Sequence, residues 1–592
     1  MEYQITVREV PETKIREYMH ELGISRILAS ALINQNISIE MAMDILTANC
    51  NEIHHSVDIP NIENAAVKIK EYLMLPKAVI QVFADYDADG ITSCAIACKA
   101  LYRLREVVNP KGKTEVIYRV PERKDGYGLS IQFAEQFAEV ARINPNMHYL
   151  VITVDNGITA GPAVAKLIQE PNIDVVVTDH HQPDFEHGLT PTDICCCVDP
   201  YLEENSDWKY LAGCGVIFNV MQKVEELCGL DHAITESLYY LAAIGTIGDM
   251  MQINLYHACL IQIGLMQLNA EPTVKWISWL KKEANIPHIT AKDIAFTIAP
   301  LINSCGQMGH ASFAIELLLA DNNEEMLTLI DKIYTLYLEN KDETKSLKQY
   351  AEDDVVENYL PEHRFVLYPL QTEHAGLASK VATHLGKQLG IPIILWAETE
   401  ENKNEETIAG SCRNDTPAPI MNIVRKAVTE GLLESAEGHT YAFGVKLYRS
   451  KLKELQDFLD QAIIKYEKSY GEIKPTVRNL NVDCIISSGD INVRNMLDIE
   501  QIPFSKNLEA PVVMIRGADI KNVRTSSNNP KNLRYTIQSR GAMRPIDIWA
   551  WNIKPDQYKR GEHKHIDMIG TIERNFMMPE YATLNVIDIR TY

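Results

Sequence analysis

Short apolar runs alternate with amphipathic stretches between residue 79 and about residue 250. The runs are rich in β-branched residues, whereas the stretches between them repeat their apolar residues at helical spacing. This alternation predicts a parallel α/β sheet, because a helix returns the chain between parallel strands. We expect its strands at 79–84, 115–119, 149–154, 174–178 and 194–198.

The pattern changes twice downstream. Residues 322–359 carry a single apolar stripe among many charges, with neither Gly nor Pro, which predicts a long connecting helix. A second α/β segment follows, with strands expected at 365–368, 391–396, 407–411 and 441–447. Beyond Pro475 the chain becomes strand-rich with short polar turns, which is typical of a small β-barrel.

These changes divide the chain into four parts. We expect a first α/β domain with an N-terminal helical segment at 1–320, the connecting helix at 321–360, the second α/β domain at 361–475 and the barrel at 476–592. The first residues lack a signal-peptide pattern, and no window approaches the roughly 18 apolar residues that a membrane span needs. We therefore expect a cytoplasmic protein that does not contact membranes.

The net charge of -23 taken alone disfavours a polyanionic partner. The last 117 residues differ, since they hold 16 Lys and Arg against 13 Asp and Glu. Within them, residues 521–565 contain ten basic and three acidic residues, interleaved with Tyr535, Trp549 and Trp551. This stretch is the candidate nucleic-acid surface, and a solvated basic face is the alternative.

Three acids follow the first expected strand directly, in the run FADYDADGIT. Asp85, Asp87 and Asp89 are two residues apart, so in an extended segment their carboxylates point the same way and can converge. Asp and Gly are also common in turns, and an ordinary turn is the alternative interpretation. Alternating acids after a buried strand favour a metal site.

Other expected elements of the sheet also end in acids. Asp155 follows 149–154, Asp179, His180 and His181 follow 174–178, and Asp249 closes an apolar segment. Any one of them could cap a helix, but so many buried like charges at one sheet edge would be costly without cations. Mixed oxygen and imidazole ligands suit Mn²⁺ and tolerate Mg²⁺. Two such ions can clamp a scissile phosphate, so the pattern predicts phosphoester hydrolysis.

DYDADG, VDNG, TDHH and GTIGD resemble, in order, the motifs of the DHH phosphoesterases. The resemblance implies a two-metal site and a role in catalysis for His181, which would orient the phosphate. The implied metal ligands are Asp87, Asp89, Asp155, Asp179, His180 and Asp249, with Asp85 where many members carry histidine.

Further motifs resemble the RecJ exonucleases of this family from about residue 60 to the C-terminus. VPERKDGYGLS and PLINSCGQMGHAS lie in the first domain, HAGLASKVATHLG, GSCR and EGHTYAFG resemble a DHHA1 domain, and IDIWAWN resembles part of an OB-fold. The implied fold class is α/β, with a parallel-sheet DHH domain, a DHHA1 domain joined by the long helix, and an OB-like β-barrel. The implied substrate-binding residues are Arg123, Asn303, Gln307, Ser411, Arg413, His439, Tyr535, Trp549 and Trp551.

The chain departs from the RecJ pattern at four places. Leu301 and Gln307 stand where RecJ enzymes usually carry arginine, His310 where they commonly carry aspartate, and Glu437 in place of a glycine. The loss of an arginine that contacts phosphate puts turnover and end selectivity in question.

The resemblance implies a monomeric enzyme that degrades single-stranded DNA from its 5′ end in repair, recombination or phage replication. A single-strand-binding protein or a helicase is the expected protein partner. Two alternatives stay open: a DHH enzyme acting on short RNA or small nucleotides such as cyclic dinucleotides, and a non-catalytic binding protein. An enzyme for short RNA or small nucleotides would have no need of the β-rich C-terminal part. A non-catalytic protein would be expected to have lost metal ligands, whereas the principal ligands are all present.

Overall fold

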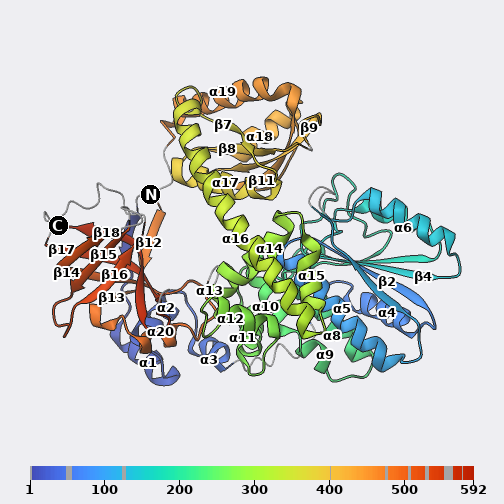
Figure 1. Ribbon diagram of the computed structural model, residues 1–592, viewed down its shortest axis with the longest axis horizontal. Coiled ribbons are helices and arrows are strands. Elements are labelled where there is room, and N and C mark those ends of the chain that lie inside the picture. Colours follow the sequence, from blue (N-terminus) through green and yellow to red (C-terminus); the bar gives the residue numbers. More distant parts are fainter. Residues whose placement is uncertain are drawn as a thin grey trace.

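The computed structural model has three lobes and describes most of the chain (Figure 1). It describes residues 3–47, 57–122, 128–400, 402–473, 478–504, 508–526, 532–551, 564–575 and 578–592. The predicted substrate contact Arg123 lies outside these residues, and so does the side chain of His439.

The first α/β domain is built on a five-stranded parallel sheet in the order β3-β2-β4-β5-β6. All five predicted strands are confirmed, and the last of them is shortened to three residues. Their bounds are β2 Ala78–Ala84, β3 Glu115–Arg119, β4 His148–Val154, β5 Ile173–Thr178 and β6 Cys196–Val198.

Helices cover both faces of this sheet because alternate strand residues face opposite ways. On one face, Tyr149 and Val151 pack with helices α6 Ile131–Ile143 and α7 Gly161–Leu167. On the other face, Leu150 and Ile152 join the largest apolar core. The helices of that side are α4 Ile62–Met74, α5 Ala88–Val108, α8 Gly213–Leu227, α10 Tyr239–Gly248, α11 Leu255–Asn269, α12 Lys275–Glu283, α14 Ala299–Gln307 and α15 Ala311–Leu319.

The predicted connecting helix is α16, Asn323–Asp354, whose last turn continues as a π-helix over Val355–Tyr359. It leads from the first lobe to the second (Figure 1). Asn322 caps its start by accepting a hydrogen bond from the Glu325 amide. One helix therefore belongs to both α/β domains.

The second α/β domain has a five-stranded sheet in the order β10-β11-β9-β8-β7. Four strands were predicted and β10 was missed, because its polar sequence LESAEGH lacks a clear apolar pattern. The elements are β7 Val366–Gln371, α17 Ala378–Leu389, β8 Ile393–Glu398, β9 Thr407–Arg413, α18 Ile420–Thr429, β10 Leu433–His439, β11 Ala442–Tyr448 and α19 Leu452–Tyr470.

The C-terminal lobe is a curled sheet in the order β16-β15-β14-β17-β18, with β13 paired to β14. Neighbouring strands along this order are antiparallel, which agrees with the predicted small β-domain. The elements are β12 Arg478–Val482, β13 Cys484–Ile486, α20 Val493–Ile499, β14 Val512–Thr525, β15 Leu533–Gln538, β16 Ile546–Ala550, β17 His565–Arg574 and β18 Ala582–Thr591.

The N-terminal segment lies against this C-terminal lobe, although the prediction grouped it with the first domain (Figure 1). Strand β1, Tyr3–Val7, pairs in parallel with β12. Helices α1 Glu12–Leu22, α2 Arg26–Asn34 and α3 Ile39–Thr47 bury a core that also includes Ile502 and Leu508 from the C-terminal lobe and Ala258 from α11. The segment thus packs against both the barrel and the first domain.

No helix in the described part of the chain is both long and apolar enough to cross a bilayer.

Candidate metal centre

Acids and imidazoles gather at the carboxyl edge of the first sheet, as predicted for ligands of such sheets. The structure brings their ligand atoms together in three overlapping groups, within 4.8 Å inside each group. The groups are Asp85, Asp87 and Asp155; Asp89, His180 and Asp249; and Asp155, His180 and His181. Six of the seven predicted metal ligands therefore converge.

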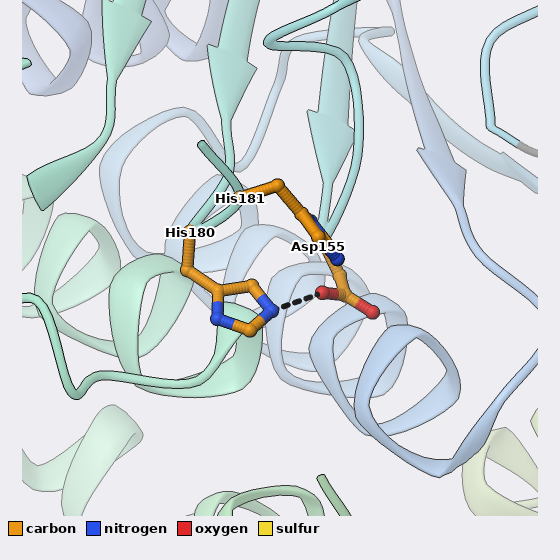
Figure 2. Close-up of side chains that lie close together, drawn as sticks. All are labelled: Asp155, His180 and His181. Carbon is orange, nitrogen blue, oxygen red and sulfur yellow. Dashed lines mark ion pairs between the residues drawn. The ribbon is translucent and has the colours of Figure 1, made fainter. Parts of the chain in front are cut away.

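His180 lies at the centre of this cluster. Figure 2 shows its ring pointing at Asp155, and its Nε2 is 3.0 Å from Asp155 Oδ1. The same nitrogen is 3.7 Å from Asp89 Oδ2 and 3.8 Å from Asp249 Oδ2. A single imidazole thus faces carboxylates from three different elements.

The loop after β2 is shaped by the start of helix α5. Asp87 is the N-cap residue, and its Oδ1 accepts hydrogen bonds from the amides of Asp89 and Gly90, both at 3.0 Å. Gly90 is required here, because a Cβ atom would lie 2.6 Å from the carbonyl oxygen of Asp85. The cap turns the chain so that Asp85, Asp87 and Asp89 share one edge.

Asp89 is held by the amino end of a second helix. Its two carboxylate oxygens accept hydrogen bonds from the Gly213 amide at 2.7 Å and the Cys214 amide at 2.9 Å. These are the first amides of α8, where the helix dipole favours a negative charge. The run LAGCGVIF at residues 211–218, which contains both amides, therefore serves to position a ligand.

Asp155 occupies a conformation unusual for a residue other than glycine, with φ 61°. Asp tolerates this region better than most residues. The next residue, Asn156, ties two strand ends together by donating to the carbonyl oxygens of Phe83 at 3.2 Å and Val154 at 2.9 Å. Asn156 was not among the predicted site residues, and it positions the ligand beside it.

Asp179 has a different environment from the other acids and lies in none of the three groups. Its Oδ1 accepts from the amide of His180 at 2.8 Å and from His181 Nδ1 at 2.7 Å, while Oδ2 accepts from the Ile158 amide at 2.9 Å. The role of Asp179 as a metal ligand stays a prediction. What the geometry provides is a carboxylate that orients His181.

The electrostatics of the cluster favour a bound cation. Burial, together with the charges of Asp89, Asp87 and Asp85, raises the pKa of Asp155 well above its usual value. Burial and Asp89 likewise raise the pKa of Asp87. Cations would relieve this repulsion, and the oxygen and imidazole donors fit divalent ions such as Mn²⁺ and Mg²⁺.

The two adjacent histidines are shifted in opposite directions. Burial and the neighbouring His181 lower the pKa of His180, which suits a neutral imidazole ligand. Burial alone would lower the pKa of His181, but the hydrogen bond and charge of Asp179 raise it to about 9. Asp179 therefore favours the protonated form of the His181 ring.

Asp199 is a further acid that the sequence analysis missed. It follows β6 at the same edge, is 0% exposed, and caps a short 3₁₀ turn by accepting from the Tyr201 amide at 2.7 Å. Burial and the charge of Asp179 raise its pKa to about 8. The signal was available, because Asp199 follows an expected strand as Asp155 and Asp179 do.

The described side chains of Asn303, Gln307 and Arg413, which were predicted to bind substrate, each form hydrogen bonds within the protein. Asn303 Oδ1 accepts from the Ala88 amide at 2.7 Å, and Gln307 Oε1 accepts from Asn340 at 3.1 Å. Arg413 Nε donates to Thr383 at 2.9 Å and its Nη1 to the Cys412 carbonyl at 2.7 Å. Ser411 lies two residues earlier on the same strand, β9.

The aromatic residues of the barrel divide into two kinds. Tyr535 is 0% exposed in the core, so its prediction as a base-stacking residue was wrong. It alternates with Leu533 and Ile537 and therefore faces inward with them. Trp549 and Trp551 lie stacked on each other, with centroids 5.3 Å apart, and Trp551 is 52% exposed.

Of the residues that depart from the RecJ pattern, Leu301 is fully buried in the large core, where its apolar side chain fits. His310 is exposed and its ring stacks on Phe313 at 5.1 Å. The side chain of Glu437 lies outside the described residues.

Three family models match the chain in the order of its lobes. The DHH family N-terminal domain matches residues 79–246, the DHHA1 domain residues 363–465, and the RecJ OB domain residues 482–588.

Two curated relatives carry the name single-stranded-DNA-specific exonuclease RecJ. The protein of Bacillus subtilis is 24% identical over 556 residues, which cover 92% of this chain and 65% of the relative. The protein of Haemophilus influenzae is 29% identical over 406 residues, which cover 66% of each chain. The chain thus spans just under two thirds of the length of these relatives.

The solved structure of RecJ in complex with Mn²⁺ from Thermus thermophilus shares the fold. The match has a TM-score of 0.77 at 21% identity and covers 100% of this chain and 80% of the other. The chain thus combines matches to the DHH, DHHA1 and RecJ OB family models, in that order along the sequence, with the fold of a solved RecJ structure.

Proposed function

We propose that this chain is a metal-dependent exonuclease that hydrolyses single-stranded DNA from the 5′ end. The observation that carries the proposal is the convergence of buried acids around His180 in a chain that also has DHHA1 and RecJ OB domains. The OB domain gives a long strand a second place to bind, which an enzyme for short RNA or cyclic dinucleotides would not need.

Two divalent ions would be held, Mn²⁺ in preference to Mg²⁺. The proposed metal ligands are Asp85, Asp87, Asp89, Asp155, Asp179, His180 and Asp249. When bound, two such ions polarise the scissile phosphate and lower the pKa of the attacking water. The chain's own residues set the geometry. The α8 amides fix Asp89, and Asp179 holds the ring of His181, which would contact the scissile phosphate.

The second domain would hold the strand through Arg413. Burial lowers the pKa of Arg413, yet an arginine remains charged at neutral pH. It takes part in none of the ion pairs in the described ranges, so no carboxylate neutralises it there. A half-buried guanidinium of this kind is suited to a DNA phosphate, with Ser411 and His439 as further proposed contacts.

The barrel would bind the strand through its tryptophan pair. Trp549 lies opposite Arg534 across strands β16 and β15, and Trp551 continues the aromatic surface. Aromatic faces beside basic side chains are typical of surfaces that bind single strands by stacking and phosphate contact. Arg123, which lies outside the described residues, is a further proposed substrate contact.

Single-stranded DNA generated in repair, recombination or phage replication is the proposed substrate. The proposed state is a cytoplasmic monomer, with a single-strand-binding protein or a helicase as partner. The relatives named as DNA exonucleases support the substrate class.

The test uses a single-stranded oligonucleotide labelled at either end, with the purified chain in Mn²⁺, in Mg²⁺ and in excess chelator. We expect mononucleotide release from the 5′ end with Mn²⁺, weaker release with Mg²⁺ and none in chelator. Asp155→Asn should reduce the rate by about 100-fold or more, because it removes a central ligand. Asp184→Asn is the matched control, since Asp184 pairs with His187 and lies outside the cluster.

Equal release in chelator would contradict a metal-dependent reaction. Rapid cleavage of a dinucleotide with no cleavage of the long strand would replace the proposal by the small-nucleotide alternative. Binding without any hydrolysis would indicate a non-catalytic protein.

A further inference from the structure

Helix α14 touches the metal-binding loop at two points. Asn303 Oδ1 accepts a hydrogen bond from the Ala88 amide at 2.7 Å, and Ala88 lies between Asp87 and Asp89. One turn further on, Gly306 packs against the loop so closely that a Cβ atom would lie 2.7 Å from the Tyr86 carbonyl oxygen. The helix therefore supports the loop that presents three of the acids.

The last residue of α14 contacts the second domain. Gln307 Oε1 accepts from Asn340 Nδ2 at 3.1 Å, and Asn340 Oδ1 accepts from Lys380 Nζ at 2.8 Å. Asn340 belongs to α16 and is 3% exposed, whereas Lys380 belongs to α17 of the second domain. These three side chains form a continuous hydrogen-bonded joint between the domains.

Backbone packing reinforces the joint. Gly376 precedes α17 in the second domain, and a Cβ atom there would lie 2.7 Å from the Cα atom of Gln307. A displacement of the second domain therefore presses directly on the end of α14. α14 has nine residues and is helical throughout, so one short element joins the Asn303 contact with the loop to the Gln307 contact with the second domain.

We propose that α14 couples the position of the second domain to the metal-binding loop, with Gln307 as the positioning residue at the joint. A strand held by the second domain would thereby stabilise the arrangement of Asp85, Asp87 and Asp89. This inference rests on the proposed function, since the loop acts on DNA only if the chain is a nuclease.

The joint gives a reason for glutamine at position 307. A glutamine side chain offers the oxygen that accepts from Asn340, whereas an arginine has no acceptor atom. An arginine would also place a second positive charge close to Lys380. The residue that departs from the RecJ pattern thus matches a contact between domains in this chain.

The test measures amide hydrogen exchange of the full-length protein in peptides covering residues 85–91 and 375–378, together with Mn²⁺ affinity by calorimetry. Gln307→Leu and Asn340→Leu should each increase exchange in both peptides by about fivefold, the effect of one lost hydrogen bond. Both should also weaken Mn²⁺ binding. Gln307→Glu should behave like the wild type, because a carboxylate also accepts from Asn340.

Thr344→Val is the matched control. Thr344 lies one turn beyond Asn340 on α16, is 7% exposed, and its Oγ1 makes no hydrogen bond within the described residues. This variant should leave both peptides unchanged.

Faster exchange at 375–378 without any change at 85–91 would overturn the coupling. No change in either peptide, or an equal change in the Thr344→Val control, would overturn it as well. These outcomes do not depend on nuclease activity. A wild-type chain that fails to bind Mn²⁺ would instead refute the proposed function.

Discussion

Gly213 lies so close to Asp155 that a Cβ atom at position 213 would be 2.5 Å from Asp155 Cβ and 2.6 Å from its Oδ1. The amino end of α8 can approach the metal centre this closely only because residue 213 has no side chain. The glycine thus serves two ligands, since its amide also binds Asp89.

Gly213→Ala should therefore disable the centre. We expect the exonuclease rate to fall by about 100-fold or more, because a displaced ligand disturbs both ions. The rate on a labelled strand and Mn²⁺ affinity are the measurements. Gly215→Ala is the control, since its Cβ would meet only the end of the Leu211 side chain at 3.1 Å. Full activity of Gly213→Ala would show that Asp155 is not needed in its present place.

Asp199→Asn should stabilise the protein increasingly as pH rises. The folded pKa of about 8 lies above the unfolded value of roughly 3.9, so between these values only the unfolded state loses its proton. The wild type therefore loses up to about 1.4 kcal/mol of unfolding free energy per pH unit in this window, and the asparagine variant does not. Urea unfolding at pH 5, 6, 7 and 8 measures the difference. A difference independent of pH would contradict a protonated Asp199.

His257→Leu should have the opposite pH signature. Burial lowers the pKa of His257 to about 4, and neither ring nitrogen has a hydrogen-bond partner within the described residues. The stability of the wild type is complete above the unfolded pKa of roughly 6.5 and falls as the pH drops toward 4. We expect the leucine variant to gain about 2 kcal/mol relative to wild type between pH 7 and 5. Parallel stability curves would show that His257 has the same pKa in the folded and the unfolded state.

Trp551→Ala should weaken binding to a long single strand by roughly 1 to 3 kcal/mol, because its exposed ring can stack on a base. Trp549→Ala should act in the same direction through loss of the paired ring. Tyr535→Phe is the control, since the buried Tyr535 side chain cannot reach a base. Fluorescence anisotropy at several salt concentrations measures the affinities. Unchanged affinity in both variants would show that Trp549 and Trp551 do not stack on the bases of the strand.

The sheet and its acidic edge could be predicted because both produce a pattern among residues that are close together in the sequence. Alternating strands and helices determine the topology, and Asp155 and Asp179 follow their strands directly. Asp199 left the same trace after β6 and was overlooked. Tyr535 could also have been placed correctly, since its apolar neighbours at 533 and 537 share its face.

Other features depend on contacts between residues far apart in the sequence, so no local pattern indicates them. The sequence does not show whether Asp179 or His181 points toward the metal cluster. The side chain of Asp179 is held by the Ile158 amide, which belongs to another loop. The contact of Gln307 depends on Asn340 and Lys380 from two other helices. Pairing of β1 with β12 joins segments more than 470 residues apart, so no periodicity reveals it.

That parallel pairing has a consequence for synthesis on the ribosome. Synthesis makes Tyr3–Val7 more than 470 residues before their partner Arg478–Val482. At about 5 to 20 residues per second, the first strand waits roughly 25 to 95 seconds for its neighbour. During that interval both α/β domains can fold, while helices α1 to α3 keep apolar side chains such as Leu28 and Leu32 without their final cover. The segment around β1 is therefore made long before it can reach its native place, and a chaperone has that whole interval in which to bind it.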